Sequence, residues 1–158
     1  MRVWRICKER HADEAFSGEG ARRVAGRWNQ RGVPLVYTAR TLALAALETF
    51  VHVDPDDMPD DLVAIPAEVP AGRRIEALDV STLPAHWRAS PGPDALRDIG
   101  GQWFAAKTSM ALRVPSAVLH DPDAPDEHNV LLNPEHPDFP ALVIGAPRPF
   151  VFDPRMRR

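Results

Sequence analysis

The chain has 158 residues, of which 44% are hydrophobic, and its formal net charge is −3. This length suits one domain with an apolar core, and the weak negative charge argues against non-specific nucleic-acid binding. No apolar stretch reaches the roughly 18 residues needed to span a bilayer, and the first residues show no signal-peptide pattern. The single cysteine, Cys7, excludes an internal disulfide, so we expect a cytoplasmic protein.

Basic residues are concentrated in the first third of the chain. Residues 1–50 carry nine Arg or Lys and five Asp or Glu, whereas residues 51–100 carry four and ten. Seventeen of the nineteen basic residues are arginine. Arginine offers a planar fork that suits carboxylates and phosphates, although GC-rich coding explains the same preference.

The first half of the chain predicts two strands and one strong helix. Val3–Cys7 and Pro34–Thr38 are typical of strands, and the polar, glycine-containing residues 8–26 between them indicate loop or a short helix. The segment Thr41–Val53 predicts a helix, because Thr41 can cap it and good helix formers follow. It is apolar nearly all round, so we expect a buried helix.

The second half predicts shorter elements. Three strands and a helix are expected at Leu62–Val69, Arg73–Leu78, Ala111–Leu119 and Asp94–Ser109. The first two strands are joined by a "PAG" turn, and Pro115 predicts an edge strand or a bulge. A short strand, a turn and a last strand in "RPFVFDP" follow. Irregularly interspersed strands and helices favour an α+β fold with a mixed or antiparallel sheet.

Glu48 is the first candidate for a functional residue, because it lies in an otherwise apolar helix. It shares a helix face with Leu44, Leu47 and Val51. Burying a carboxylate without a partner is costly. Glu48 therefore points into a polar pocket, pairs with an arginine, or reaches solvent at the rim.

Four further residues are candidates, each with a purely structural alternative. Tyr37 is a core aromatic or a stacking platform for a flat ring. Arg27, in "AGRWN", is a surface residue or an anion ligand, and Arg31 has a weaker context. Ser116 follows Pro115, so it is either exposed to a cleft or buried and bonded to the backbone. The chain has no G-x-S-x-G motif, which argues against a serine hydrolase.

The segment "HDPDAPDEH" gathers histidines and carboxylates at His120, Asp121, Asp123, Asp126, Glu127 and His128. Zinc or a hard cation is conceivable there. The spacing matches no metal motif such as H-E-x-x-H, and proline-rich acidic loops are usually solvated. We therefore expect no metal.

Four segments together resemble the RES domain, which is named for its Arg, Glu and Ser. They are "GRWNQRGVPLVYTARTLALAALETFVH", "LRVPSAV", "NVLLNPEHPDF" and "PFVFDPR", in the family's order between Val3 and Arg155. The resemblance implies a single RES domain over residues 1–158, with a fold like that of ADP-ribosyltransferases. It also implies a toxin that attacks NAD without a metal and is paired with an Xre-type helix-turn-helix antitoxin. The stretch between Leu78 and Trp103 matches little of the family's pattern.

By matching motif, the resemblance implies roles for the candidate residues. Glu48 would stabilise positive charge on the ribose, and Tyr37 would stack on the nicotinamide. Arg27, with Arg31 near it, would bind the pyrophosphate, and Ser116 would bind the nicotinamide side or the ribose. The acceptor of ADP-ribose stays open between water, phosphate and a protein. Two alternatives are an RNase toxin, which would need a basic groove with stacking aromatics, and a non-catalytic partner-binding module.

Overall fold

The computed structural model describes residues 1–54, 57–119, 121 and 126–156. Its strands are β1 (Arg2–Lys8), β2 (Val36–Ala39), β3 (Leu62–Glu68), β4 (Ile75–Ala77), β5 (Ala111–Pro115), β6 (His128–Leu132), β7 (Val143–Ile144) and β8 (Arg148–Phe150). Its α-helices are α1 (Glu19–Arg23), α2 (Leu42–Phe50) and α3 (Asp94–Ala106).

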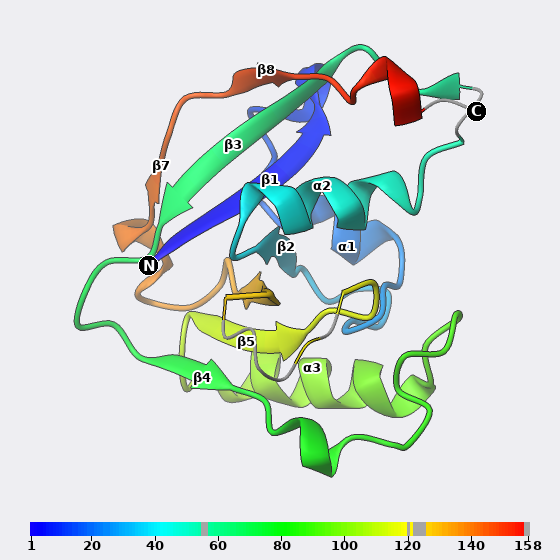
Figure 1. Cartoon of the computed structure of the whole chain (residues 1–158). Coiled ribbons are helices and arrows are strands. Elements are labelled where there is room, and N and C mark those ends of the chain that lie inside the picture. Colours follow the sequence, from blue (N-terminus) through cyan, green and yellow to red (C-terminus); the bar gives the residue numbers. More distant parts are fainter. Residues whose placement is uncertain (55–56, 120, 122–125, 157–158) are drawn as a thin grey trace.

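The strands form one sheet in the order β4-β5-β6-β2-β1-β3-β7, and β8 also pairs with β3 (Figure 1). The pairing of β4 with β5 is parallel, and the other described pairings are antiparallel. The predicted α+β fold with a mixed sheet is therefore confirmed. Among the described residues, no helix is long and apolar enough to cross a membrane.

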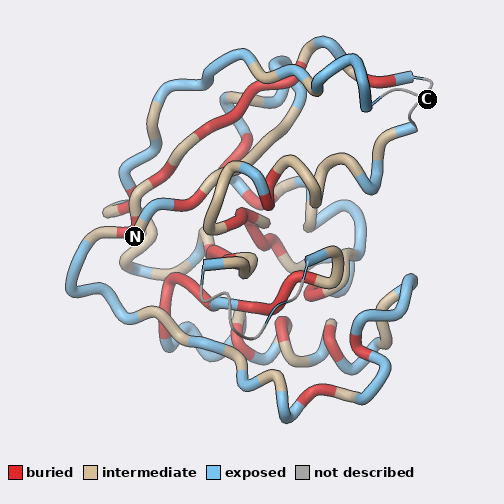
Figure 2. Tube along the Cα trace, in the orientation of Figure 1, coloured by how far each residue is buried: buried red, intermediate tan, exposed pale blue. Residues whose placement is uncertain are grey.

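Helices α2 and α3 pack on the same face of the sheet. Along β2 and the residue before it, Leu35 and Ala39 point to one face and Val36 to the other. Leu35 packs in the cluster that contains the α3 residue Trp103, whereas Ala39 packs against Leu44 of α2. Val36 belongs to a separate core on the opposite face. Figure 2 shows the buried residues following the strands and one side of α3.

Local chemistry explains where α2 begins and why α3 contains glycine. The Thr41 side chain accepts a hydrogen bond from the backbone N–H of Leu44 at 3.1 Å, which confirms the predicted cap. Gly100 lies against the loop before β2, where an added Cβ would come within 1.9 Å of the Trp28 carbonyl oxygen. The missing side chain at Gly100 lets α3 support that loop directly.

The predicted strands on either side of the "PAG" turn are both present, but they do not pair with each other, since β3 pairs with β1 while β4 lies at the far end beside β5. Two other predictions about the elements were wrong. Strand β5 is internal, between β4 and β6, and it ends at Pro115. Helix α2 buries only Leu44 and Ala45 fully, because another side of it borders a cavity.

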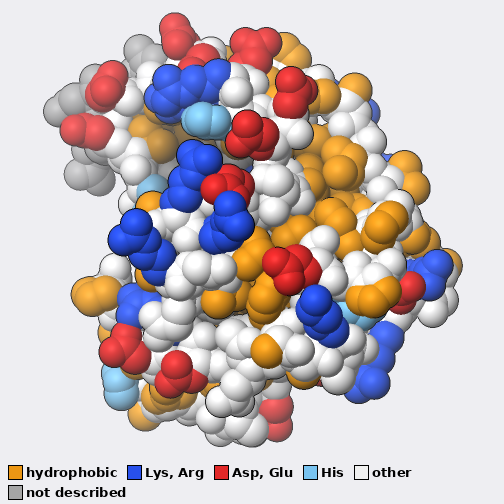
Figure 3. Space-filling model, turned by 180° about the vertical axis from the view of Figure 1, so that it is seen from behind, with side chains coloured by type: hydrophobic (Ala, Val, Ile, Leu, Met, Phe, Trp, Pro, Cys, Tyr) orange, Lys and Arg blue, Asp and Glu red, His pale blue; other side chains and the backbone are white. Residues whose placement is uncertain are grey.

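The face seen in Figure 3 shows apolar side chains together with charged groups of both signs. The ring of Phe152 contacts those of Phe150 and Phe50 edge to face, with centroids 5.1 and 5.5 Å away, respectively. Through these contacts the segment after β8 packs against the end of α2.

Candidate active site

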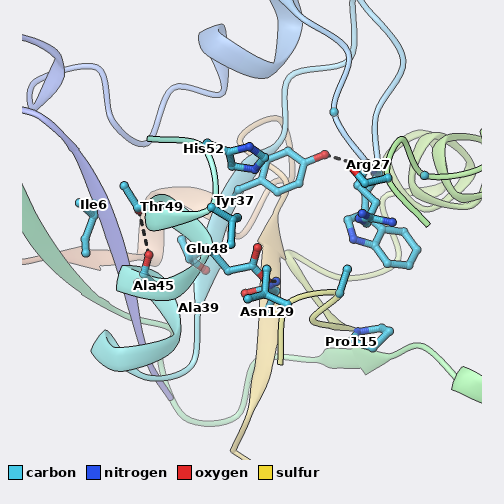
Figure 4. A pocket seen from close by; sticks show the side chains of 18 of the residues that line it. Ile6, Arg27, Tyr37, Ala39, Ala45, Glu48, Thr49, His52, Pro115 and Asn129 are labelled. Atoms are coloured by element: carbon cyan, nitrogen blue, oxygen red, sulfur yellow. Dashed lines mark hydrogen bonds between the residues drawn. The ribbon is translucent and has the colours of Figure 1, made fainter. Parts of the chain in front are cut away.

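A cavity of about 790 Å³ opens on the face of the sheet that carries both helices (Figure 4). Its lining comes from β1, β2, α2, α3, the loop at residues 25–28, the loop at 88–92, the residues around the end of β5, and the start of β6. This volume lies within the range of about 300–1,000 Å³ that is typical of small-molecule sites. The cavity is thus lined by segments that are far apart in the sequence.

Glu48 points into this cavity from α2, and neutral groups hold its carboxylate. Its Oε1 accepts hydrogen bonds from the Ser116 hydroxyl at 2.7 Å and from Asn129 Nδ2 at 2.5 Å. Figure 4 shows the carboxylate turned toward Asn129. No ion pair joins Glu48 to a basic residue in the part of the chain that the structure describes. Of the three alternatives for Glu48, the structure shows the polar pocket.

Ser116 is fully buried and does not line the cavity. Its hydroxyl oxygen accepts hydrogen bonds from the backbone N–H groups of Val118 and Leu119, at 3.1 and 3.0 Å. Its only proton is donated to Glu48. Direct contact of Ser116 with a substrate stays a prediction, since the observed contacts connect it to the site through Glu48.

Tyr37 lines the cavity with its ring, and its hydroxyl group is tied to the loop that carries Arg27. The hydroxyl accepts from the Trp28 backbone N–H at 3.0 Å and donates to Asn29 Oδ1 at 2.7 Å. Burial raises the pKa of Tyr37 to about 12, against the opposing effects of the Trp28 hydrogen bond and the nearby charges of Arg27 and Arg97. The phenol is therefore neutral at physiological pH.

Arg27 lies on the other side of the cavity from the start of α2 and braces two loops. Its Nη1 donates to the carbonyl oxygens of Trp87 at 2.7 Å and Ala89 at 3.1 Å. Its Nε and Nη2 donate to no described residue, so part of the fork is available to an anion. Arg31, in contrast, is exposed and is not among the cavity-lining residues.

Three further arginines line the cavity that the sequence did not single out. Arg97 of α3 donates to the Gly26 carbonyl oxygen at 3.0 Å, and Arg88 donates to that of Ala117 at 3.2 Å. Arg5 donates to the Tyr37 carbonyl oxygen at 2.8 Å, where β1 and β2 diverge. Burial lowers the pKa of Arg5, whose Nε is buried without a partner among the described residues.

The electrostatic character of the cavity is positive. Four arginines line it against one acidic residue, Glu48, among the described residues. This excess of positive charge attracts an anionic ligand. The same ligand can carry a hydroxyl or a positively charged group that interacts with the Glu48 carboxylate. His120 and Asp123 of the "HDPDAPDEH" segment lie outside the described residues. Among the residues that are described, no group of three or more His, Cys, Asp or Glu is arranged to hold a metal.

The sequence matches the RES domain family over residues 2–153. The chain belongs to the RES domain family. Among its relatives, "Toxin Res" of Photorhabdus laumondii is 37% identical over 88% of this chain and 85% of its own length. "Toxin Res" of Yersinia enterocolitica is 34% identical over 99% of this chain and all of its own. The "Prs ADP-ribosylating toxin" of a Sphingobium species is 37% identical over 98% and 96%.

The fold of this RES domain is also found in a solved structure. A chain of the M. tuberculosis MbcT–MbcA toxin–antitoxin complex superposes with a TM-score of 0.70 at 14% identity, covering 94% of this chain and 83% of that one. The resemblance to the RES domain drawn from the sequence motifs is thus confirmed. Two cavity residues had not been given a role: Asn129, which lies in one of those motifs, and Arg97, which lies outside them.

Proposed function

We propose that this chain is an NAD-consuming toxin of a bacterial toxin–antitoxin pair, which acts in the cytoplasm and cleaves the bond between nicotinamide and ribose. Relatives over nearly the whole chain are named toxins, and one of them is named an ADP-ribosylating toxin. The observation that carries the proposal is the Glu48 carboxylate, held by neutral donors in a cavity that four arginines also line.

The residues present suit NAD as substrate. The pyrophosphate requires cationic donors, and Arg27 has an unengaged part of its fork at the cavity, while Arg5 has a buried Nε without a described partner. The positively charged nicotinamide ring suits the face of Tyr37, because aromatic faces attract cations. Binding therefore uses the arginines for the pyrophosphate, and the Tyr37 ring with Glu48 for the nicotinamide and its ribose.

Glu48 supplies the main chemical assistance in this proposal. When the nicotinamide–ribose bond breaks, nicotinamide leaves as a neutral molecule with the bonding electron pair, and positive charge develops on the ribose. A carboxylate beside that ribose stabilises the developing charge. Since nicotinamide leaves as a neutral molecule without needing a proton, no general acid is required.

The acceptor of the ADP-ribose group is water, phosphate or a protein, and one assay separates these cases. Purified chain is incubated with NAD, with and without inorganic phosphate, and separately with a cell extract. Mass spectrometry then identifies free ADP-ribose, phosphorylated ADP-ribose or a modified protein. A parallel incubation with RNA tests the RNase alternative. NAD that stays intact in all three incubations would refute the proposed function.

We also propose that an Xre-type antitoxin restrains the enzyme by occupying this cavity. Unrestrained loss of NAD would harm the host cell, and the four arginines make the cavity a natural acceptor for a carboxylate of a partner protein. Antitoxin and a non-hydrolysable NAD analogue should then compete. In a titration, saturating analogue should weaken antitoxin binding. Unchanged antitoxin affinity would show that the antitoxin binds elsewhere.

A further inference from the structure

The two hydrogen bonds to Glu48 reach the same oxygen atom. Ser116 and Asn129 both donate to Oε1, and no described residue donates to Oε2. A glutamate side chain has three rotatable bonds, and fixing it costs conformational entropy that contacts must offset. Two donors on one oxygen fix the carboxylate plane and leave the other oxygen available to a ligand.

Asn129 is well placed to hold the Glu48 carboxylate in a fixed position. It lies on β6, where its backbone is paired with Ala39 of β2 on one side and with Val114 of β5 on the other. Ser116 follows directly after β5, and Glu48 lies on the helix that follows β2. Three neighbouring strands therefore set the positions of both donors and of the helix that bears the acceptor.

Asn129 differs from Ser116 because it lines the cavity as well as contacting Glu48. The geometry points to Asn129 as a positioning residue that, with Ser116, fixes Glu48 through Oε1 so that Oε2 faces the ribose. This inference rests on the proposed NAD cleavage and deepens it. It assigns the stabilising oxygen of Glu48 and gives Ser116 a role without substrate contact.

The first test measures NAD turnover by Asn129→Ala beside the wild type. A carboxylate that is free to rotate is poorly aligned with the reacting ribose, so we expect kcat to fall by about 10- to 100-fold, in line with the cost of misplaced groups. The KM for NAD should stay within about twofold, because the pyrophosphate contacts are intact. Asn129→Asp, which keeps the size but removes the donor, should lose at least as much and serves if Asn129→Ala folds poorly.

Asn133→Ala is the matched control, since Asn133 is a buried asparagine just past the end of the same strand. Its Nδ2 donates to the Phe104 carbonyl oxygen at 3.0 Å, away from the cavity. Its kcat should stay close to that of the wild type. Wild-type kcat in folded Asn129→Ala and Asn129→Asp would overturn the inference, and so would a raised KM with unchanged kcat.

A second measurement separates failure of this inference from failure of the proposed function. If the wild type consumes no NAD, the proposed function fails, but the contact is still tested by unfolding. The urea midpoint shifts of Glu48→Ala and Asn129→Ala should not add in the double variant, because the second substitution finds no contact left to remove. Additive shifts would overturn the inference whatever the activity.

Discussion

Substituting Glu48 with glutamine tests the proposed chemistry while leaving the local structure almost unchanged. The glutamine carbonyl oxygen can still accept from both Ser116 and Asn129, which now donate to Oε1 at 2.7 and 2.5 Å. The amide nitrogen then takes the place of Oε2. The variant therefore loses a negative charge and presents a donor where the wild type presents an acceptor.

The structure allows the size of the effect to be estimated separately for activity and stability. Removing one group that stabilises transition-state charge typically slows an enzyme by about 100- to 1,000-fold. The free energy of unfolding should change by less than about 1 kcal/mol, because no buried donor is stranded. Glu48→Ala should behave differently, since it leaves the Ser116 and Asn129 donors unsatisfied at about 1–3 kcal/mol each.

The assay is nicotinamide release under saturating NAD, with urea unfolding of the same preparations. We expect Glu48→Gln to be nearly inactive with a wild-type unfolding midpoint, and Glu48→Ala to be both inactive and less stable. Full NAD turnover by folded Glu48→Gln would refute the role of the carboxylate. A large loss of stability in Glu48→Gln would refute the hydrogen-bond argument.

Three further predictions follow from named contacts. The Tyr37 phenol has a pKa of about 12 when folded and an ordinary value of 10, so its contribution to stability is complete below pH 10 and is lost as the pH rises toward 12. The loss, relative to Tyr37→Phe, should be about 2–3 kcal/mol in alkaline unfolding. Because Tyr37 is the only tyrosine, phenolate absorbance follows it directly, and an ordinary titration at pH 10 would contradict the burial. Arg27→Ala should raise the KM for NAD about 10- to 100-fold, as expected for a charged hydrogen bond, and an unchanged KM would exclude pyrophosphate binding there. Gly100→Ala should lower the free energy of unfolding by about 1–3 kcal/mol through its clash with Trp28. Gly101→Ala, which meets open space, should raise it by up to about 1 kcal/mol, and equal effects in thermal unfolding would contradict this packing.

Local sequence was enough to predict the part of the site built on β2 and α2. Thr41 and the helix formers after it set the start of α2. The lone carboxylate among apolar residues singled out Glu48 but left a polar pocket, an arginine pair and the solvent-exposed rim open, and the structure places it in the cavity. The resemblance to the RES domain then named Arg27, Tyr37 and Ser116. Of these, Arg27 and Tyr37 line the cavity together with Glu48.

The cavity residues that local sequence could not predict are brought there by contacts between elements far apart in the chain. Asn129 reaches Glu48 only because β6 lies beside β2, and the two residues are 81 positions apart. Arg97 lies in the stretch between Leu78 and Trp103, where no motif matched, and α3 brings it to the cavity. Pro115 predicted an edge strand or a bulge, but it ends an internal strand, and Ser116 after it donates to Glu48.

The most direct test of the account is the release of nicotinamide from NAD by the purified wild-type chain, measured beside Glu48→Gln. The account predicts that the wild type releases many equivalents of nicotinamide per protein, either alone or once phosphate or a protein acceptor is supplied. Glu48→Gln should release at least about 100-fold less in the same time. Intact NAD with the folded wild type under all of these conditions, or equal release by both proteins, would contradict it.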